Sequence, residues 1–257
     1  PIVLQTSTPI EHGYSTKGTL QQWRDNVAIP IAGQNRVAFA LSCAFAGQLL
    51  HLLGERHGGG FHYWGASSMG KSITLAVAGS VWGNQMIKSW RSTDNALENI
   101  ALLHNDSVLC LDEIGESDPR IVGKSIYMLA NGQAKNRMTK TGVNKQAATW
   151  RVMVLSNGEY TIENYLRQAG ETVKAGQEVR LCSIEANAGK NLGIFDSLTL
   201  ADTSAKQAEL LRENTDCYYG IAGITWLEYL TDNKDNVIAQ AHDLKRVFLA
   251  DYADFIC

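Results

Sequence analysis

Residues 65–72 read Gly65-Ala66-Ser67-Ser68-Met69-Gly70-Lys71-Ser72 and match the pattern G-x-x-x-x-G-K-[ST]. In a loop of this pattern, backbone N–H groups surround phosphate oxygens, the lysine contacts the β- and γ-phosphates, and the serine hydroxyl binds Mg²⁺. A strand is expected at 61–64, and a helix from about 71 to 82 would point its positive end at the phosphates. The pattern therefore predicts an ATP and Mg²⁺ site formed by Gly65, Ala66, Ser67, Ser68, Met69, Gly70, Lys71 and Ser72. The alternative is a glycine-containing turn with an exposed lysine.

Two acids follow a buried strand further along the chain. The apolar run 107–111 ends in Asp112 and Glu113, 41 residues after Lys71. We expect Asp112 to hold the magnesium through water and Glu113 to polarise the attacking water. An apolar run followed by two acids is a weak signal alone, and the alternative is that the pair caps the next turn. The signal becomes informative because the run and its two acids follow the loop at 65–72 in this order and at this spacing.

Two later polar residues are further catalytic candidates. A strand at 150–155 is followed by Asn157, which would face the γ-phosphate if that strand lies beside the Asp112 strand. The alternative is that Asn157-Gly158 is simply a turn. Arg180 precedes a last expected strand and is interpreted as an arginine finger for a neighbouring subunit's nucleotide, the alternative being a surface or salt-bridge residue. Arg167 and Lys206 are weaker candidates for nucleotide sensing.

The charge is distributed unevenly along the chain. The net charge is −3, yet residues 119–158 contain no acid and carry +7, which leaves −10 for the rest. This asymmetry is typical of a local binding surface for nucleic acid. Lys135, Arg137, Lys140 and Lys145 lie around Gly142, a turn residue, and are predicted to bind single-stranded or forked DNA. The alternative is a chance gap in acids on a solvated face.

Composition excludes several other classes. No run of 18 apolar residues occurs, so no membrane-spanning helix is expected. Five cysteines without a CxxC pair indicate free thiols in a reducing cytoplasm, and the histidines show no zinc-ligand spacing. The chain starts at Pro1 without a leader sequence, which we interpret as an excised piece of a longer protein.

Alternating strands and helices predict parallel βαβ units with helices covering the sheet. Further strands are expected at 86–92 and 178–184. Further helices are expected at 37–53, 94–104, 119–131, 162–169, 203–214, 220–231 and 235–256. We therefore predict an N-terminal lead-in and helical segment at 1–57, a P-loop ATPase core at 58–190 and a small helical lid at 191–257.

Several short motifs together resemble one family. They include Gly18-Thr-Leu-Gln-Gln-Trp23, Leu50-His-Leu-Leu53, the loop 65–72, Val81-Trp-Gly83, Trp90-Arg-Ser-Thr-Asp-Asn95, Leu103-His-Asn-Asp106, Leu111-Asp-Glu113 and Tyr127-Met-Leu-Ala-Asn-Gly132. Over about residues 18–230 the chain resembles the "domain of unknown function 927" family of phage, plasmid and genomic-island proteins. Its members are described as helicase-like, with ATPase cores similar to superfamily 3 and minichromosome-maintenance helicases of the AAA+ class.

The resemblance implies roles for individual residues. The loop 65–72 matches Walker A, Asp112 with Glu113 matches Walker B, and Asn157 matches sensor 1. Arg180 falls where those helicases carry a trans-acting arginine, and the short basic segment 132–150 falls where they carry a pore hairpin that touches DNA. No sensor-2 arginine is identified. The implied protein is a homo-oligomeric, hexameric AAA+ motor, the helicase part of a mobile-element primase-helicase. The alternatives are a nucleotide-dependent switch or loader and a non-hydrolysing nucleotide-binding scaffold.

Overall fold

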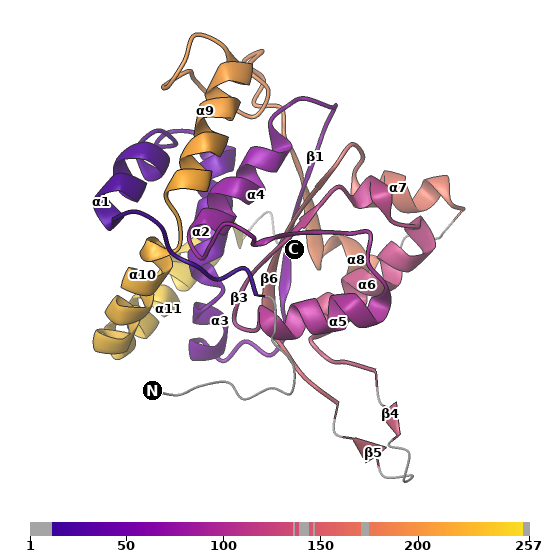
Figure 1. Ribbon diagram of the computed structural model, residues 1–257. Coiled ribbons are helices and arrows are strands. Elements are labelled where there is room, and N and C mark those ends of the chain that lie inside the picture. The colour runs from indigo at the N-terminus through magenta and orange to yellow at the C-terminus, as the bar shows by residue number, and fades with distance from the viewer. Residues whose placement is uncertain (1–11, 136, 139–143, 146, 171–174, 254–257) are drawn as a thin grey trace.

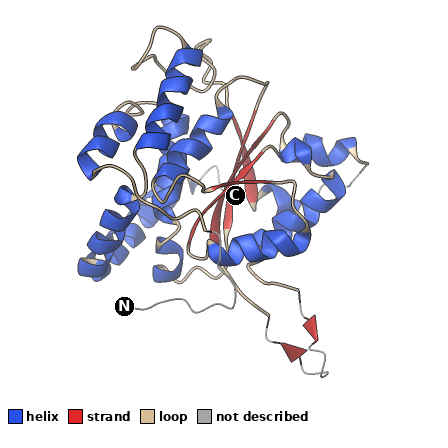
Figure 2. Cartoon of the chain, viewed as in Figure 1, coloured by secondary structure: helices blue, strands red, loops and turns tan. Residues whose placement is uncertain are grey.

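A parallel sheet forms the centre of the molecule. The computed structural model describes residues 12–135, 137–138, 144–145, 147–170 and 175–253. Its five strands are β1 (Gly59–Trp64), β2 (Ile87–Ser89), β3 (Ser107–Asp112), β6 (Val152–Gly158) and β7 (Leu181–Glu185). They pair in the order β2-β3-β6-β1-β7, and every pair is parallel. Helices lie on both sides of the sheet (Figure 2), so the predicted α/β, P-loop type fold is confirmed.

The strand order brings the predicted polar residues to one edge. The register pairs Tyr63 with Asn157 and Trp64 with Gly158. It also pairs Leu111 with Ser156, so β6 lies between β1 and β3. Because the carboxyl ends of parallel strands meet at one edge, the segments that follow β1, β3 and β6 converge there. The Asn157 strand therefore lies beside the Asp112 strand, which is the condition under which Asn157 was expected to face the γ-phosphate.

Two groups of helices cover the two faces (Figure 1). On one face, α2 (Asn35–Ala46) and α4 (Lys71–Ser80) contact β3 and β6. Outside them lie α1 (Leu20–Trp23), the π-helix η1 (Arg24–Ala28), α3 (Leu49–Leu52), α9 (Ser204–Cys217), α10 (Ile221–Asp232) and α11 (Lys234–Asp251). On the other face, α6 (Pro119–Asn131) contacts β1 and β6, with α5 (Asp94–Leu103), α7 (Ile162–Gln168) and α8 (Ala175–Glu178) around it.

Local capping signals set several helix ends. The Thr93 side chain accepts from the Ala96 N–H at the start of α5. Helix α6 begins with Pro119 after an Asp118 cap and ends at Gly132, whose φ of 67° is left-handed. Proline at the first turn and glycine after the last turn are the expected residues at those positions. The ends that the sequence predicted for these two helices are therefore correct to within a residue.

Three predicted elements differ from the structure. The helix expected at 37–53 is divided into α2 and α3 around Gly47, where an added Cβ would lie 2.6 Å from the Ser107 carbonyl carbon. This close approach of two backbones is a tertiary constraint that helical periodicity does not contain. The strand expected at 86–92 is limited to Ile87–Ser89. The last strand begins at Leu181 rather than 178, because the turn α8 occupies Ala175–Glu178.

The N-terminal and C-terminal helices share one hydrophobic core. This core joins Trp23 and Val37 from the N-terminal helices, Leu75 from α4, and Leu211 and Ala222 from α9 and α10. Residues Lys17 and Tyr219 also form an antiparallel bridge. Burial of this apolar surface stabilises the contact by about 25 cal/mol per Å². The division into three units stays a prediction, but its first and third units lie on the same face of the sheet.

The basic segment contains a small hairpin. Strands β4 (Arg137–Met138) and β5 (Asn144–Lys145) pair antiparallel. An isolated bridge joins Gln133 to Thr149 at the base of this hairpin. In Figure 1 these strands lie away from the central sheet, beyond the end of β6 opposite to α4. No helix in the described residues is long and apolar enough to cross a membrane.

Candidate functional site

The loop 65–72, called the phosphate loop below, connects β1 to α4. Gly70 has a left-handed φ of 86° and caps α4. An added Cβ at Gly70 would lie 2.9 Å from Cγ2 of Ile194, so glycine is required both by conformation and by space. The first backbone N–H groups of α4, before that of Ile73, have no intrahelical partner. The loop therefore provides the geometry of an anion site at a helix N-terminus.

Lys71 is buried at the centre of the loop, with 7% of its surface exposed. Its ammonium group donates to the carbonyl oxygens of Gly65 at 2.8 Å and Ala66 at 2.7 Å. Burial lowers the pKa of Lys71, while the nearby carboxylates of Glu113, Glu159 and Asp112 act to raise it. A cation held in this way is positioned to contact phosphate oxygens.

Three predicted residues meet through one amide group. Nδ2 of Asn157 donates to Oδ1 of Asp112 at 2.7 Å and to Oγ of Ser72 at 3.3 Å. The Ser72 hydroxyl in turn donates to the same Asp112 oxygen at 3.3 Å. Asn157 is 1% exposed, so its hydrogen bonds fix its orientation. The structure thus brings α4, β3 and β6 together at one point.

Glu113 has two structural features. Its backbone is left-handed, with φ of 50°, and its N–H donates to Oδ1 of Asn157 at 2.7 Å. Its carboxylate accepts from the Gly115 N–H at 3.2 Å, which caps the 3₁₀ turn η2 (Ile114–Glu116). The alternative role of Glu113 as a cap is therefore present in the structure. Glu113 also lines the cleft beside Lys71, so its role toward water stays a prediction.

Ser72 and Asp112 suit a magnesium ion. Mg²⁺ prefers oxygen ligands, keeps several waters and takes only one or two ligands from the protein when phosphates supply the rest. A hydroxyl and a carboxylate oxygen 3.3 Å apart beside the phosphate loop satisfy that requirement. No group of three or more His, Cys, Asp or Glu side chains that could hold a metal occurs in the described residues.

A cleft of about 450 Å³ opens above the phosphate loop. It is lined by Ser67, Ser68, Met69, Gly70, Lys71, Ser72, Ile73, Glu113, Asn157, Ala208, Glu209 and Arg212. Arg212 is the residue that sequence reasoning missed. Ala205, Ala208 and Arg212 are spaced by three and four positions on α9, so they share one helix face. That spacing is the signal that could have placed Arg212 opposite the loop.

The other arginine and lysine candidates lie elsewhere. Arg167 is paired with Glu163 on α7, and Lys206 is paired with Glu209 at 2.7 Å on α9. Arg180 immediately precedes β7 and pairs with the amino end of β1, because the Gly60 N–H donates to the Arg180 carbonyl. This position is at the sheet edge opposite to the phosphate loop of the same chain.

The Arg180 side chain contacts its own chain. Its Nη1 donates to the Gly176 carbonyl at 2.8 Å, its Nε donates to Oδ1 of Asn131 at 3.3 Å, and its guanidinium lies 5.0 Å from the centre of the Tyr127 ring. A role at a neighbouring subunit's nucleotide stays a prediction. Any such role has to operate from this packed position or after its contacts are released.

Of the four predicted DNA-binding residues, three lie in described segments. Lys135 is exposed, and its ammonium group pairs with Asp94 at 2.7 Å. The hairpin register pairs Arg137 in β4 with Lys145 in β5. Lys140 lies outside the described residues. The hairpin itself is where the family resemblance implied one.

The fold and the loop geometry define an α/β protein of the P-loop class, with a five-stranded parallel sheet between two layers of helices. Residues 1–149 match the family described as Domain of unknown function (DUF927), and the chain belongs to this family. The matched segment includes the phosphate loop, Asp112 and Glu113, and ends before Asn157 and Arg180.

One solved structure supports the fold. A structure described as "SCCmec type IV Cch - active helicase" is 24% identical, with a TM-score of 0.69 over 98% of this chain. This chain spans 45% of the length of that protein. A structure of NtrX from Brucella abortus in complex with ATP is 12% identical, with a TM-score of 0.37 over 59% of this chain and 36% of that one, which is too low to support an inference. No curated protein matches the chain.

Proposed function

We propose that this protein is an ATP-hydrolysing AAA+ motor that acts on DNA as the helicase part of a mobile-element replication protein. One observation carries the proposal. Lys71, Ser72, Glu113 and Asn157 follow or end three separate strands and line one cleft. Asp112 contacts this group through Ser72 and Asn157. A charged lysine, an oxygen pair for Mg²⁺ and a carboxylate are the groups that phosphoryl transfer to water requires.

The residues have distinct roles in this proposal. Backbone N–H groups of the phosphate loop and Lys71 bind the phosphates. Ser72 and Asp112 hold Mg²⁺, which supplies charge neutralisation when it is bound. Glu113 accepts a proton from the attacking water. Buried Asn157 orients the Asp112 carboxylate and holds the backbone of Glu113 in place. Arg212 reaches the same cleft from the lid and adds a positive charge beside the phosphates.

Two further observations support a motor of the AAA+ class that acts on DNA. Strand β6 lies between the strand of the phosphate loop and the strand of the acids, so Asn157 at its end stands between the two. The basic hairpin follows α6 and leads directly into β6, at whose end Asn157 lies. A change at Asn157 therefore has a short covalent route to the hairpin. The similarity to a protein described as an active helicase supports the same proposal.

We also propose a homo-oligomeric ring, hexameric and cytoplasmic, with ATP sites between subunits. The support for a ring is Arg180, which lies far from its own phosphate loop. Two other functions remain as alternatives. A switch or loader would hydrolyse ATP without DNA stimulation, and a scaffold would bind ATP without turnover.

Steady-state ATP hydrolysis with and without single-stranded DNA separates the three functions. The motor predicts turnover that rises with DNA and disappears in Lys71→Ala. Lys190→Ala is a matched control, because Lys190 is exposed and lines neither pocket beside the loop. Turnover without any DNA stimulation would favour the switch, and ATP binding without turnover would favour the scaffold.

A further inference from the structure

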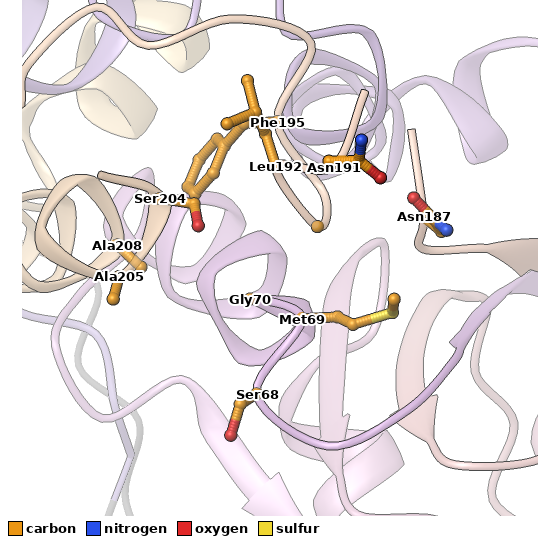
Figure 3. A pocket seen from close by; sticks show the side chains of 11 residues that line it. Ser68, Met69, Gly70, Asn187, Asn191, Leu192, Phe195, Ser204, Ala205 and Ala208 are labelled. Atoms are coloured by element: carbon orange, nitrogen blue, oxygen red, sulfur yellow. The ribbon is translucent and has the colours of Figure 1, made fainter. Parts of the chain in front are cut away.

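A second pocket adjoins the cleft above the phosphate loop. Its volume is about 290 Å³, and it shares Ser68, Met69, Gly70 and Ala208 with the cleft. Figure 3 shows its remaining side chains, which come from the segment after β7 and from the first turns of α9. Because the two pockets share the loop, a molecule whose phosphates lie at Lys71 can extend into this one.

The outer wall of the pocket is held in place by buried hydrogen bonds. The Ile194 N–H donates to the Met69 carbonyl at 2.9 Å, which ties the wall to the phosphate loop. Oε1 of Gln34 accepts from the Asp196 N–H at 2.8 Å, and the Gln34 side chain is fully buried. Oε1 of Gln207, equally buried, accepts from the Thr199 N–H at 2.6 Å. A pocket with a wall fixed in this way loses little ordering entropy when it binds a ligand.

The lining of the pocket is uncharged. Leu192, Phe195, Ala205 and Ala208 provide apolar surface, and Asn187, Asn191, Ser68 and Ser204 provide polar groups. No Asp, Glu, Lys or Arg is among its described lining residues. A flat, apolar ring with polar edges suits such a wall better than a sugar or a charged group does.

Asn187 and Asn191 offer different hydrogen-bonding groups to a ligand in this pocket. Oδ1 of Asn187 accepts from the Gly189 N–H at 2.9 Å, so its amide N–H₂ is what remains for a ligand. The Asn191 side chain makes no hydrogen bond with the described residues and can both donate and accept. Asn191 has a left-handed φ of 59°, which asparagine tolerates better than most residues.

We propose that this pocket binds the nucleobase and selects adenine over guanine through Asn191. An asparagine amide matches adenine, because it can accept from the exocyclic N6 amino group while it donates to a ring nitrogen. Guanine presents two acceptors at O6 and N7, which arginine or lysine reads, and donors at N1 and N2, which a carboxylate reads. The described lining contains neither kind of side chain. The inference rests on the proposed function, since the base reaches this pocket only if the phosphates bind at residues 65–72.

Two substitutions test the proposal without disturbing the backbone. Asn191→Asp keeps the shape and the left-handed tolerance but removes the donor and adds a negative charge. Asn191→Gly keeps the backbone conformation and removes the amide. We expect the wild type to bind the slowly hydrolysed thio analogue of ATP more tightly than that of GTP in calorimetric titrations with Mg²⁺. The preference should fall about tenfold in both variants, the effect of losing one well-formed hydrogen bond.

Lys190→Ala, the neighbouring and exposed position, serves as the control and should keep the wild-type preference. Equal affinity of the wild type for the two analogues, or an unchanged preference in both Asn191 variants, would overturn the base assignment while leaving ATP binding at the loop intact. Failure of the wild type to bind either analogue would instead overturn the proposed function together with this inference.

Discussion

Asn157 shows how much of the site depends on single side chains. Its amide group accepts from the Glu113 N–H and donates to Asp112 and Ser72, so one residue links three separate segments. Leaving such buried partners unsatisfied costs about 1–3 kcal/mol. Residues at this edge therefore influence stability as well as chemistry, and substitutions there need a separate measurement of folding.

Glu113→Gln should lower ATP turnover by roughly 100-fold or more while ATP binding is kept, because glutamine cannot accept the proton of the attacking water. The substitution is well suited to this question, since the amide oxygen of glutamine can still accept from the Gly115 N–H and preserve the turn. Turnover and affinity are measured by steady-state hydrolysis and calorimetry. Glu116→Gln, the same change on the same turn, is the control, and wild-type turnover in Glu113→Gln would mean that Glu113 acts only as a cap.

Arg212→Ala should weaken ATP binding by about tenfold or more, because a hydrogen bond between charged groups contributes about 1.5–3 kcal/mol. Arg212 lines the cleft, and its guanidinium makes no ion pair within the described part of the chain. Arg212→Lys should recover part of the loss. Arg246→Ala removes an exposed arginine from α11 and is the control for the change of net charge. Affinity equal to wild type in Arg212→Ala would show that the lid does not contact the nucleotide through this residue.

At the scale of elements, a buried histidine joins strands and loops behind the site. The Trp90 indole N–H donates to Oγ of Ser156 at 2.8 Å, and Nδ1 of His62 lies 3.0 Å from the same oxygen. Nε2 of His62 lies 2.9 Å from the Tyr160 carbonyl, which can only accept. His62 is thus assigned as neutral with its proton on Nε2, and the Ser156 hydroxyl donates to Nδ1.

Burial lowers the pKa of His62 to about 4, although the Tyr160 carbonyl opposes the shift. The unfolded chain binds a proton near pH 6.5, so the folding free energy attributable to His62 is complete above that pH. It decreases as the pH falls and levels off below about 4. The expected loss is on the order of 3 kcal/mol, measured by denaturant unfolding at several pH values.

His62→Asn should flatten this pH dependence, even if it lowers stability at every pH. His104 is also buried with a lowered pKa, so a smaller slope will remain. His242→Asn, on an exposed part of α11, should leave the slope unchanged. The same slope in His62→Asn as in the wild type would contradict the assignment of His62 as the titrating group.

The function of the basic hairpin can be tested by removing positive charges from it. Replacing Lys140 and Lys145 with alanine should reduce DNA-stimulated hydrolysis and spare basal hydrolysis, because the hairpin strands lie away from the central sheet and its phosphate loop. Binding to single-stranded DNA should weaken, and the salt dependence of log K should decrease by about 0.7 for each phosphate that is no longer neutralised. Lys190→Ala with Lys234→Ala is a control of equal charge. An unchanged salt slope and affinity would mean that the hairpin is only a solvated face.

Local signals made several of these elements predictable. The apolar run before Asp112, the proline at the start of α6 and Gly132 at its end are short-range patterns, and the structure follows them. The break at Gly47 depends on the approach of Ser107, which no local pattern contains. Arg212 is similar, because its spacing places it on one helix face with Ala205 and Ala208, but only tertiary packing turns that face toward the loop.

At the scale of the whole molecule, Arg180 is the residue that tests assembly. If it acts on a neighbouring subunit, Arg180→Ala should lose roughly 10³-fold or more in turnover, the range for an arginine finger. Mixing Arg180→Ala with Lys71→Ala chains should then restore some hydrolysis, since a mixed interface can contain an intact Lys71 and an intact Arg180. Each variant alone, shown to be folded by circular dichroism, is the control. No recovery would place Arg180 within its own chain, where it packs on Tyr127.

The order of the expected elements along the sequence predicted the parallel sheet. It did not predict which helices would cover the same face of that sheet. The expected lead-in and the expected lid are separated by the whole core in sequence, yet Trp23 and Leu211 belong to one cluster. Such pairing is decided by which apolar helix faces are left uncovered, and periodicity alone does not specify their partners. The same limit applies to the pocket beside Gly193, which exists only because the segment after β7 returns to the phosphate loop.

The position of β1 in the sheet has a consequence for how the chain is made. Both neighbours of β1 come late, at 152–158 and 181–185. At about 5–20 residues per second, ribosomal synthesis from Trp64 to Glu185 takes on the order of ten seconds. During that interval the nascent strand has two unpaired edges, which are sites for misassociation. A fragment that stops at residue 149 would keep β1 in this state permanently, because both strands that cover its edges come later in the chain.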